Sequence, residues 1–414
     1  SYGSLGNGNI DPYSFQELFK IKQSSLVLNG IRPQYTGQPA VIPLGLTWEK
    51  STTLNLGLEF DFLSNRLQFS GDIYQRKTTD MFTVGMSLPA VFGTDVPKGN
   101  YADLTTKGFE LSVSWRDQFQ LASKPFNYEV RFTLADYQST IDKYNNPEKK
   151  LGDDYYYEGM KVGEIWGYET EGFFTSQADI DSHAKQPYFY AGATAGQWLP
   201  GDIKFKDLNG DGVIDYGNNT VDNPGDQKII GNSEPRFIYG INLSGDWNNF
   251  FVSAFFQGVG KQDWWPGSEA SYFWGMYNRP YNDMPKSHLG NIWTEENPNT
   301  YFPRLRGYSS EEPYAELNLK QTRYLQNIAY IRMKNIQLGY TLPKSFISKL
   351  RMQNAKVYVS GENLWSWSPF YKYSKDLDVE AVRGSDRDLT EGTSGNGYSY
   401  PILKSVSFGL SVTF

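Results

Sequence analysis

The sequence predicts an all-β fold, an antiparallel transmembrane β-barrel with long extracellular loops. Apolar and polar residues alternate in many segments, and short and long connections between these segments follow one another in turn. Aromatic residues make up 16% of the chain, with 30 Tyr, 26 Phe and 11 Trp. Tyr and Trp join an apolar ring to a polar tip, which suits the rims of a membrane barrel but also sugar-binding surfaces and protein interfaces.

The clearest alternation is at the C-terminus. In VSFGLSVTF every second residue from Val406 to Phe414 is apolar, and Ser, Gly or Thr lies between. Such a strand suits lipid on one face and a wet lumen on the other, although a β-sandwich strand with one face in a core has the same pattern. Similar alternation occurs in residues 54–62, 67–73, 109–115, 128–134, 239–244, 336–342 and 357–359.

Connection lengths favour the barrel over the sandwich. Long links are expected at roughly 79–104, 144–234, 261–320 and 369–400, and they alternate with short links at 63–66, 118–124, 246–249 and 343–353. In an outer-membrane barrel, short turns face the periplasm and long loops face outside, whereas a sandwich has no reason to alternate. This order places Phe414 at the periplasmic end.

The N-terminal region is ambiguous. Residues 16–28 could form a spanning strand, but the alternation favours a hairpin inside an outer loop of roughly 5–45, with residues 1–4 at the top of a strand. This leaves nine spanning strands and a stub. Because a large plugged barrel has about 22 strands, the missing ones are expected N-terminal to Ser1. Residues 344–351 should form one or two helical turns.

Composition and motifs exclude several classes of function. The net charge of −7 gives no basic face for nucleic acid, and the absence of Cys rules out thiolate metal sites and thiol catalysis. No apolar run is long enough for a transmembrane helix. The only histidines are His183 and His288, and no G-x-S-x-G, H-E-x-x-H or phosphate-loop motif is present. We therefore expect no enzyme.

Several stretches resemble one family when taken together in order. They are YGSLGN at 2–7, LTWEKSTTLNLGLEFDFLSNRL at 46–67, YADLTTKGFELSVSW at 101–115, GEIWGYETEGFF at 163–174, GDIKFKDLNGDGVID at 201–215, IIGNSEPRFIYGINLSGDW at 229–247, YIRMKNIQLGYTLP at 330–343 and VYVSGENLW at 357–365. With the terminal strand, they resemble the C-terminal part of SusC-type, RagA-like TonB-dependent transporters of Bacteroidetes.

This resemblance implies that residues 1–414 are the C-terminal part of a 22-stranded barrel whose plug domain and N-terminal strands are absent from this sequence. It implies a multi-pass protein of the Gram-negative outer membrane that imports glycan fragments or peptides. The implied partners are membrane lipid, a SusD-like surface lipoprotein that acts as a lid, and the TonB–ExbB–ExbD machinery, which the missing parts would contact.

An acidic motif in the longest link predicts a structural Ca²⁺ site. It follows the D-x-N-x-D-G pattern of calcium loops, in which alternate residues offer oxygen ligands. The position that holds a bidentate Glu in an EF-hand is Asn218 here, so a further carboxylate is needed, with Asp226 the first candidate and Asp222 the second. A metal-free Asp/Asn/Gly turn is the alternative. The predicted ligands are Asp207, Asn209, Asp211, the carbonyl of Val213, Asp215 and Asp226.

Aromatic residues also crowd the link after residue 260. Trp264, Trp265, Tyr272 and Trp274 could contact a ligand or a lid protein, because exposed rings stack on sugars and grip apolar side chains. Alternatively, they pack one loop against another.

Phe414 has a second expected role. A final strand that ends in Phe is, as the resemblance implies, the signal read by the barrel assembly machinery. Two other functions stay open from the sequence: a secreted, calcium-stabilised β-sandwich that binds carbohydrate, and a passive porin.

Overall fold

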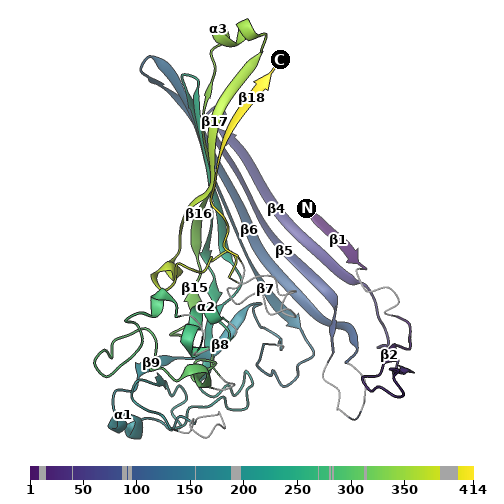
Figure 1. Cartoon of the computed structure of the whole chain (residues 1–414). Coiled ribbons are helices and arrows are strands. Elements are labelled where there is room, and N and C mark those ends of the chain that lie inside the picture. The colour runs from purple at the N-terminus through teal and green to yellow at the C-terminus, as the bar shows by residue number, and fades with distance from the viewer. Residues whose placement is uncertain are drawn as a thin grey trace.

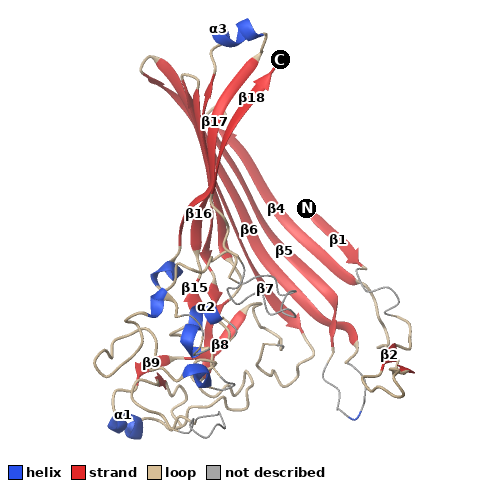
Figure 2. Cartoon of the chain, in the orientation of Figure 1, coloured by secondary structure: helices blue, strands red, loops and turns tan. Residues whose placement is uncertain are grey.

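The structure is a computed structural model. It describes residues 1–414 apart from 9–14, 40, 86–90, 92–95, 154, 188–196, 269, 279–280, 282–283, 312–314 and 383–399. Strands dominate it, as Figures 1 and 2 show. Among the helices of the described residues, none combines the length and the apolar character needed to cross a membrane.

Ten strands form one continuous sheet, in which each strand lies antiparallel to its neighbours in chain order. This confirms the predicted barrel wall, with a six-residue strand β1 before nine longer ones. The other sheets in the described part of the chain have two strands each, so no second large sheet supports the sandwich alternative. The bounds are β1 Tyr2–Asn7, β4 Glu49–Phe62, β5 Leu67–Val84, β6 Lys98–Leu121, β7 Lys124–Lys143, β12 Arg236–Trp247, β13 Phe250–Lys261, β16 Tyr330–Thr341, β17 Asn354–Trp367 and β18 Ser405–Thr413.

The connections sort to the two ends of the sheet. In Figure 1 the hairpin turns gather at one end, with the C-terminus and helix α3 (Lys344–Ile347), and the long links gather at the other. A 3₁₀ turn, Ser348–Leu350, continues α3, so the expected helical turns of 344–351 are present. The strands reach further than the alternation indicated, because β6 has 24 residues, about twice what a bilayer crossing needs.

The tight turns have the backbone that hairpins require. Ala122 and Ser123 connect β6 to β7 with φ of 48° and 64°, and Asn248 and Asn249 connect β12 to β13 with φ of 49° and 69°. Positive φ at both central residues matches the twist of the flanking strands. Asn tolerates this region better than most residues.

The alternating residues of the sheet form two different faces. On β4, Leu54, Leu56 and Leu58 are 61%, 62% and 56% exposed. Asn55, on the opposite face, donates a hydrogen bond to Asp72 of β5 at 2.8 Å. An exposed apolar face beside a hydrogen-bonded polar face is what contact with lipid on one side and water on the other requires.

Smaller elements occupy the long links. The hairpin of β2 (Ile21–Gln23) and β3 (Gln34–Thr36) lies outside the main sheet, as favoured for the N-terminal region. The sequence did not indicate the remaining pairs. They are β8 (Glu164–Tyr168) with β11 (Gln227–Asn232), β9 (Thr170–Phe173) with β10 (Ile203–Phe205), and β14 (Asp263–Trp264) with β15 (Gln326–Asn327). The short helices are α1 Gln177–Ser182 and α2 Ser271–Trp274, with 3₁₀ turns at Gly275–Tyr277, Lys286–His288, Gly307–Ser310 and Pro369–Lys372.

The main apolar core lies in the long links rather than in the sheet. We use "loop body" for the described residues of 144–235, 262–329 and 368–382. Its core joins all three links, with Phe205, Trp274 and Phe370 each at most 1% exposed. Most of the buried apolar side chains of the described residues therefore lie at the long-loop end, while the sheet leaves its apolar face outward.

Aromatic rings cover glycines across the sheet. Gly339 of β16 lies directly opposite Phe251 of β13, and a Cβ at Gly339 would come 2.2 Å from Cζ of that ring. Gly409 and Tyr358 repeat the arrangement between β18 and β17. Such glycines are needed because the opposite ring occupies the space of their side chain.

We expect Gly339→Val to displace the Phe251 ring and to destabilise the sheet by about 1–3 kcal/mol, the usual cost of overpacking. The measurement is the urea midpoint of the purified protein in detergent. Gly3→Val in β1 is the control, because nothing lies within 4 Å of a Cβ there. Equal midpoints for the two variants would contradict the close packing.

Candidate functional site

The predicted calcium loop is a closely hydrogen-bonded turn. The Asp207 carboxylate accepts hydrogen bonds from the backbone N–H groups of Gly210 at 2.6 Å and Gly212 at 2.9 Å. Both glycines have positive φ, 77° and 83°. These bonds hold the pKa of Asp207 below its usual value, so this carboxylate is ionised at neutral pH.

The side chain of Asp226, the first candidate for the additional carboxylate, contacts the acidic loop near both of its ends. This side chain is buried and accepts hydrogen bonds from the backbone N–H groups of Leu208 at 2.7 Å and Asp215 at 2.8 Å. Burial raises its pKa. Asp222, the second candidate, is exposed. The structure therefore brings Asp226 to both ends of the predicted ligand segment.

The other predicted ligands are also engaged locally. Asp211 accepts from the Val213 N–H at 2.8 Å and from the Asn209 side chain at 3.0 Å, and Asp215 accepts from the Gly217 N–H at 2.7 Å. Within the described residues, no group of three or more His, Cys, Asp or Glu side chains is arranged to hold a metal ion. A carboxylate that accepts one hydrogen bond per oxygen keeps lone pairs for another partner. The Ca²⁺ site stays a prediction.

The aromatic cluster divides into buried and exposed members. Trp264 and Trp274 are 4% and 0% exposed, and both belong to the core of the loop body. Trp265 is half-buried with its ring 6.1 Å from that of Trp274, and Tyr272 is 58% exposed. The two buried tryptophans pack one loop against another, which is the alternative that the sequence left open. Tyr272 has an exposed ring that a ligand or a lid protein could contact.

A buried ionic cluster, which the sequence did not indicate, joins two of the long links. Asp202, which is 0% exposed, accepts hydrogen bonds from Arg304 at 2.6 Å and from Nε of Arg306 at 2.9 Å. Glu316, also 0% exposed, accepts from the Ile203 N–H at 2.9 Å. Its Oε1 accepts no hydrogen bond and lies 3.9 Å from Nε of Arg306. Burial, with the nearby Asp202 carboxylate, raises the pKa of Glu316 to about 8.

A second cluster connects the sheet to the third long link. Arg332 of β16 is buried, with NH2 2.6 Å from the Asp378 carboxylate and Nε 2.7 Å from that of Glu380. Lys334 on the same strand lies 2.5 Å from Glu380. These ion pairs hold residues 368–382 against the strand from which the loop body emerges.

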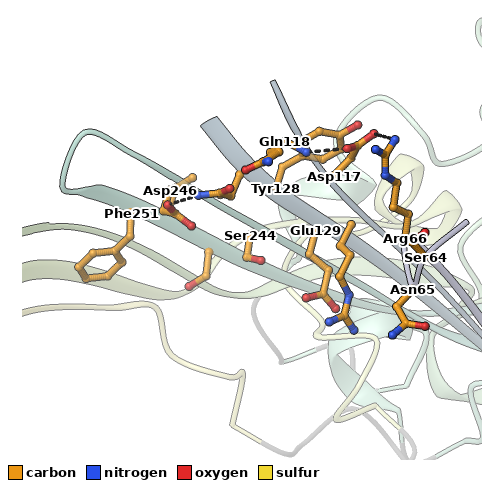
Figure 3. A pocket seen from close by; sticks show the side chains of 15 residues that line it. Ser64, Asn65, Arg66, Asp117, Gln118, Tyr128, Glu129, Ser244, Asp246 and Phe251 are labelled. Carbon is orange, nitrogen blue, oxygen red and sulfur yellow. Dashed lines mark hydrogen bonds and ion pairs between the residues drawn. The ribbon is translucent and has the colours of Figure 1, made fainter. Parts of the chain in front are cut away.

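A polar hollow of about 720 Å³ lies on the sheet near the short turns (Figure 3). Asn127 donates to Asp246 at 2.8 Å, and Arg66 lies 3.4 Å from Asp117. Hydrogen-bonding side chains from β6, β7 and β12 line this surface, as expected for the wet face of the wall.

Phe414 follows the last residue of β18 and is 79% exposed. In the described part of the chain β18 pairs with β17 alone, so its outer edge has no strand beside it. This placement is compatible with a recognition signal and with a rim residue in lipid.

The fold of this chain matches part of a solved transporter structure. The solved structure titled "Structure of the RagAB peptide transporter" matches 100% of this chain and 40% of its own, with a TM-score of 0.69 and 19% sequence identity. The same importer in an "open-open" state matches with a TM-score of 0.66.

Known sequences confirm the resemblance to SusC-type receptors. TonB-dependent receptor P3 of Formosa agariphila is 27% identical over 436 residues, and TonB-dependent receptor SusC of Bacteroides thetaiotaomicron is 23% identical over 439 residues. Both alignments cover 100% of this chain, which spans 39% and 37% of these two relatives. The relatives are named as receptors, not as enzymes. No family model matches the chain.

We expect the loop body to loosen as pH rises. The pKa of Glu316, about 8 in the folded protein, lies above that of an unfolded Glu, about 4.3. Its protonation therefore stabilises the fold fully below about pH 4.3, and this contribution is lost as pH rises through about 8. Limited proteolysis of the loop body should be faster at pH 9 than at pH 6.

Glu316→Gln should weaken this pH dependence, because the amide stays neutral throughout. Glu158→Gln, at an exposed position of the loop body, is the matched control and should leave it unchanged. If proteolysis of Glu316→Gln follows pH as steeply as that of the unaltered protein, the buried glutamate does not control the effect.

Proposed function

We propose that this chain forms part of an active importer of the Gram-negative outer membrane, energised by TonB, that takes up glycan fragments or peptides. The observation that carries the proposal is similarity over the whole chain to proteins named TonB-dependent receptors. The single antiparallel sheet with an exposed apolar face supports a location in the membrane.

The proposed partners follow from the relatives. RagAB, named as a peptide transporter, and the SusC receptor support a SusD-like surface lipoprotein above the long-loop end. With the lipoprotein at the cell surface, the loop body would lie outside the cell and Phe414 would lie at the periplasmic face. Contact with TonB–ExbB–ExbD would be made by parts of the transporter outside residues 1–414.

Uptake by cells that express the complete transporter tests energised import. We expect uptake of a radiolabelled mixture of oligosaccharides and peptides, and we expect a protonophore or deletion of tonB to abolish it. A strain without the transporter gene gives the background. Uptake that needs the gene but neither TonB nor the proton gradient would contradict active import and support the passive porin.

We also propose that the acidic loop binds a structural Ca²⁺. The support is the spacing from Asp207 to Asp215 together with the position of Asp226 at both ends of that segment. Oxygen ligands from such a loop suit a hard cation. The ion would hold residues 207–226 together in the longest link, with no part in chemistry.

Isothermal titration of the purified protein with Ca²⁺, after treatment with a chelator, tests this site. We expect binding in the unaltered protein and at least a tenfold loss in Asp211→Ala, which removes one carboxylate. Asp181→Ala in α1, an exposed acidic residue outside the loop, should bind normally. Equal binding by Asp211→Ala and the unaltered protein would contradict the site.

We propose that Phe414 is read by the barrel assembly machinery. Its exposed ring at the end of β18 supports this role. Deletion of Phe414 should lower the amount of protein at the cell surface several-fold while synthesis continues, measured by surface biotinylation against total protein. Phe346→Ala in α3, another exposed Phe at the short-turn end, is the control. Unchanged surface amounts after the deletion would contradict a signal role.

A further inference from the structure

A second hollow, of about 340 Å³, lies within the loop body, and its described lining includes none of the residues of the acidic turn 207–213. Residues from three segments that are distant in the sequence form its walls: 151–153 with 155–168, then 216–227, and 318–320. A volume of this size suits a small ligand or one unit of a larger one.

Backbone hydrogen bonds hold the three walls in place. The Leu151 N–H donates to the Asn219 carbonyl at 2.8 Å, and the Asn219 side chain donates to the Leu151 carbonyl at 2.9 Å. The Tyr168 N–H donates to the Lys320 carbonyl at 2.8 Å, and Tyr168 also pairs with Gln227 between β8 and β11. The hollow is therefore formed before any ligand arrives, which lowers the entropy cost of binding.

Aromatic rings give this hollow its apolar surface. Tyr155 and Tyr216 line it from two different walls and are 44% and 42% exposed. Trp166 lines it as well, and its indole N–H donates to Tyr157 at 3.3 Å. Exposed rings held by a rigid framework can stack on a flat apolar face of a ligand.

The polar groups of the hollow are amides and charged side chains that already have partners in the wall. The side-chain amide of Gln227 donates two long hydrogen bonds, 3.4 Å to Asn219 and 3.4 Å to the Pro224 carbonyl, which a ligand hydroxyl could replace. Lys320 forms an ion pair with Asp153, and the Glu164 carboxylate accepts hydrogen bonds from the Tyr157 hydroxyl and the Lys161 N–H. The one cation among the described lining side chains, Lys320, is already paired, so the carboxylate of a peptide terminus has no unpaired cation to bind there.

We propose that this hollow is a binding subsite for one neutral saccharide unit. A sugar ring has one apolar face for Tyr155 or Tyr216 and hydroxyls for the amides of Asn219 and Gln227. The subsite would hold a glycan at the long-loop end of the protein. Its role in uptake rests on the proposed import function, whereas its binding chemistry does not.

The test uses the complete purified transporter in detergent on an array of neutral oligosaccharides, with an array of short peptides beside it. We expect binding to at least one neutral glycan and a tenfold or greater loss of affinity in Tyr216→Ala and Tyr155→Ala. Tyr35→Ala in β3, an equally accessible tyrosine outside the hollow, should bind as the unaltered protein does. Circular dichroism verifies that each variant is folded.

Three outcomes would overturn the subsite. They are binding to no neutral glycan, glycan binding that both pocket variants retain, and binding to peptides alone that is lost in Tyr216→Ala. Binding needs no energy source, so its result is separate from the uptake experiment. Glycan binding without TonB-dependent uptake would refute import alone, and uptake without binding in the hollow would refute the subsite alone.

Discussion

Pairing of the backbone is the constraint on which this architecture depends. In the hydrocarbon layer no water satisfies an N–H or C=O group, so each strand must bond to a neighbour along its length. An antiparallel order of strands achieves this with turns as short as Ala122–Ser123. In such a sheet every second connection lies at the same end. Long connections at that end leave the hydrogen bonds between strands intact, and the loop body lies there.

The loop body meets a different constraint, because it contains buried carboxyl groups. Asp202, Asp226 and Glu316 are each 0% exposed. Asp226 is satisfied by backbone N–H groups, Asp202 by two arginines, and Glu316 retains an oxygen that accepts no hydrogen bond. Removal of one partner from a buried ion pair costs about 3–5 kcal/mol, so the Asp202 carboxylate and its two arginines hold two of the long links in one arrangement.

The sheet was predictable from sequence because its signals are local. Alternation from Leu54 to Phe62, or from Val406 to Phe414, indicates which residues lie on each face of the sheet. The length of each connection indicates at which end of the barrel that connection lies. The length of β6 was underestimated, since its outer part, from Lys98, carries polar and apolar residues without strict alternation. The expectation of a lipoprotein lid and of the TonB machinery came from the family resemblance, because alternation alone carries no information on partners.

The loop body was less predictable because its contacts are non-local. The acidic motif predicted that Asp207 to Asp215 form a calcium loop. Asp226 was proposed as a further ligand because Asn218 stands where an EF-hand has a bidentate Glu. Nothing in the sequence pairs Asp202 with Arg304 and Arg306, about 100 residues away, or brings Tyr155 and Tyr216 to the same hollow. Aromatic crowding near Trp264 was visible, but crowding alone does not tell a core from a binding surface.

The shared core of the three long links bears on how such proteins can diversify. Phe205, Trp274 and Phe370 come from different links and pack in one cluster, so none of these links can be exchanged for another sequence in isolation. A graft of 262–329 from a relative would meet foreign partners on two sides and leave cavities or clashes. Engineering a new specificity should therefore transplant the three links as a set, or restrict changes to surface residues such as Tyr155 and Tyr216 that the core does not use.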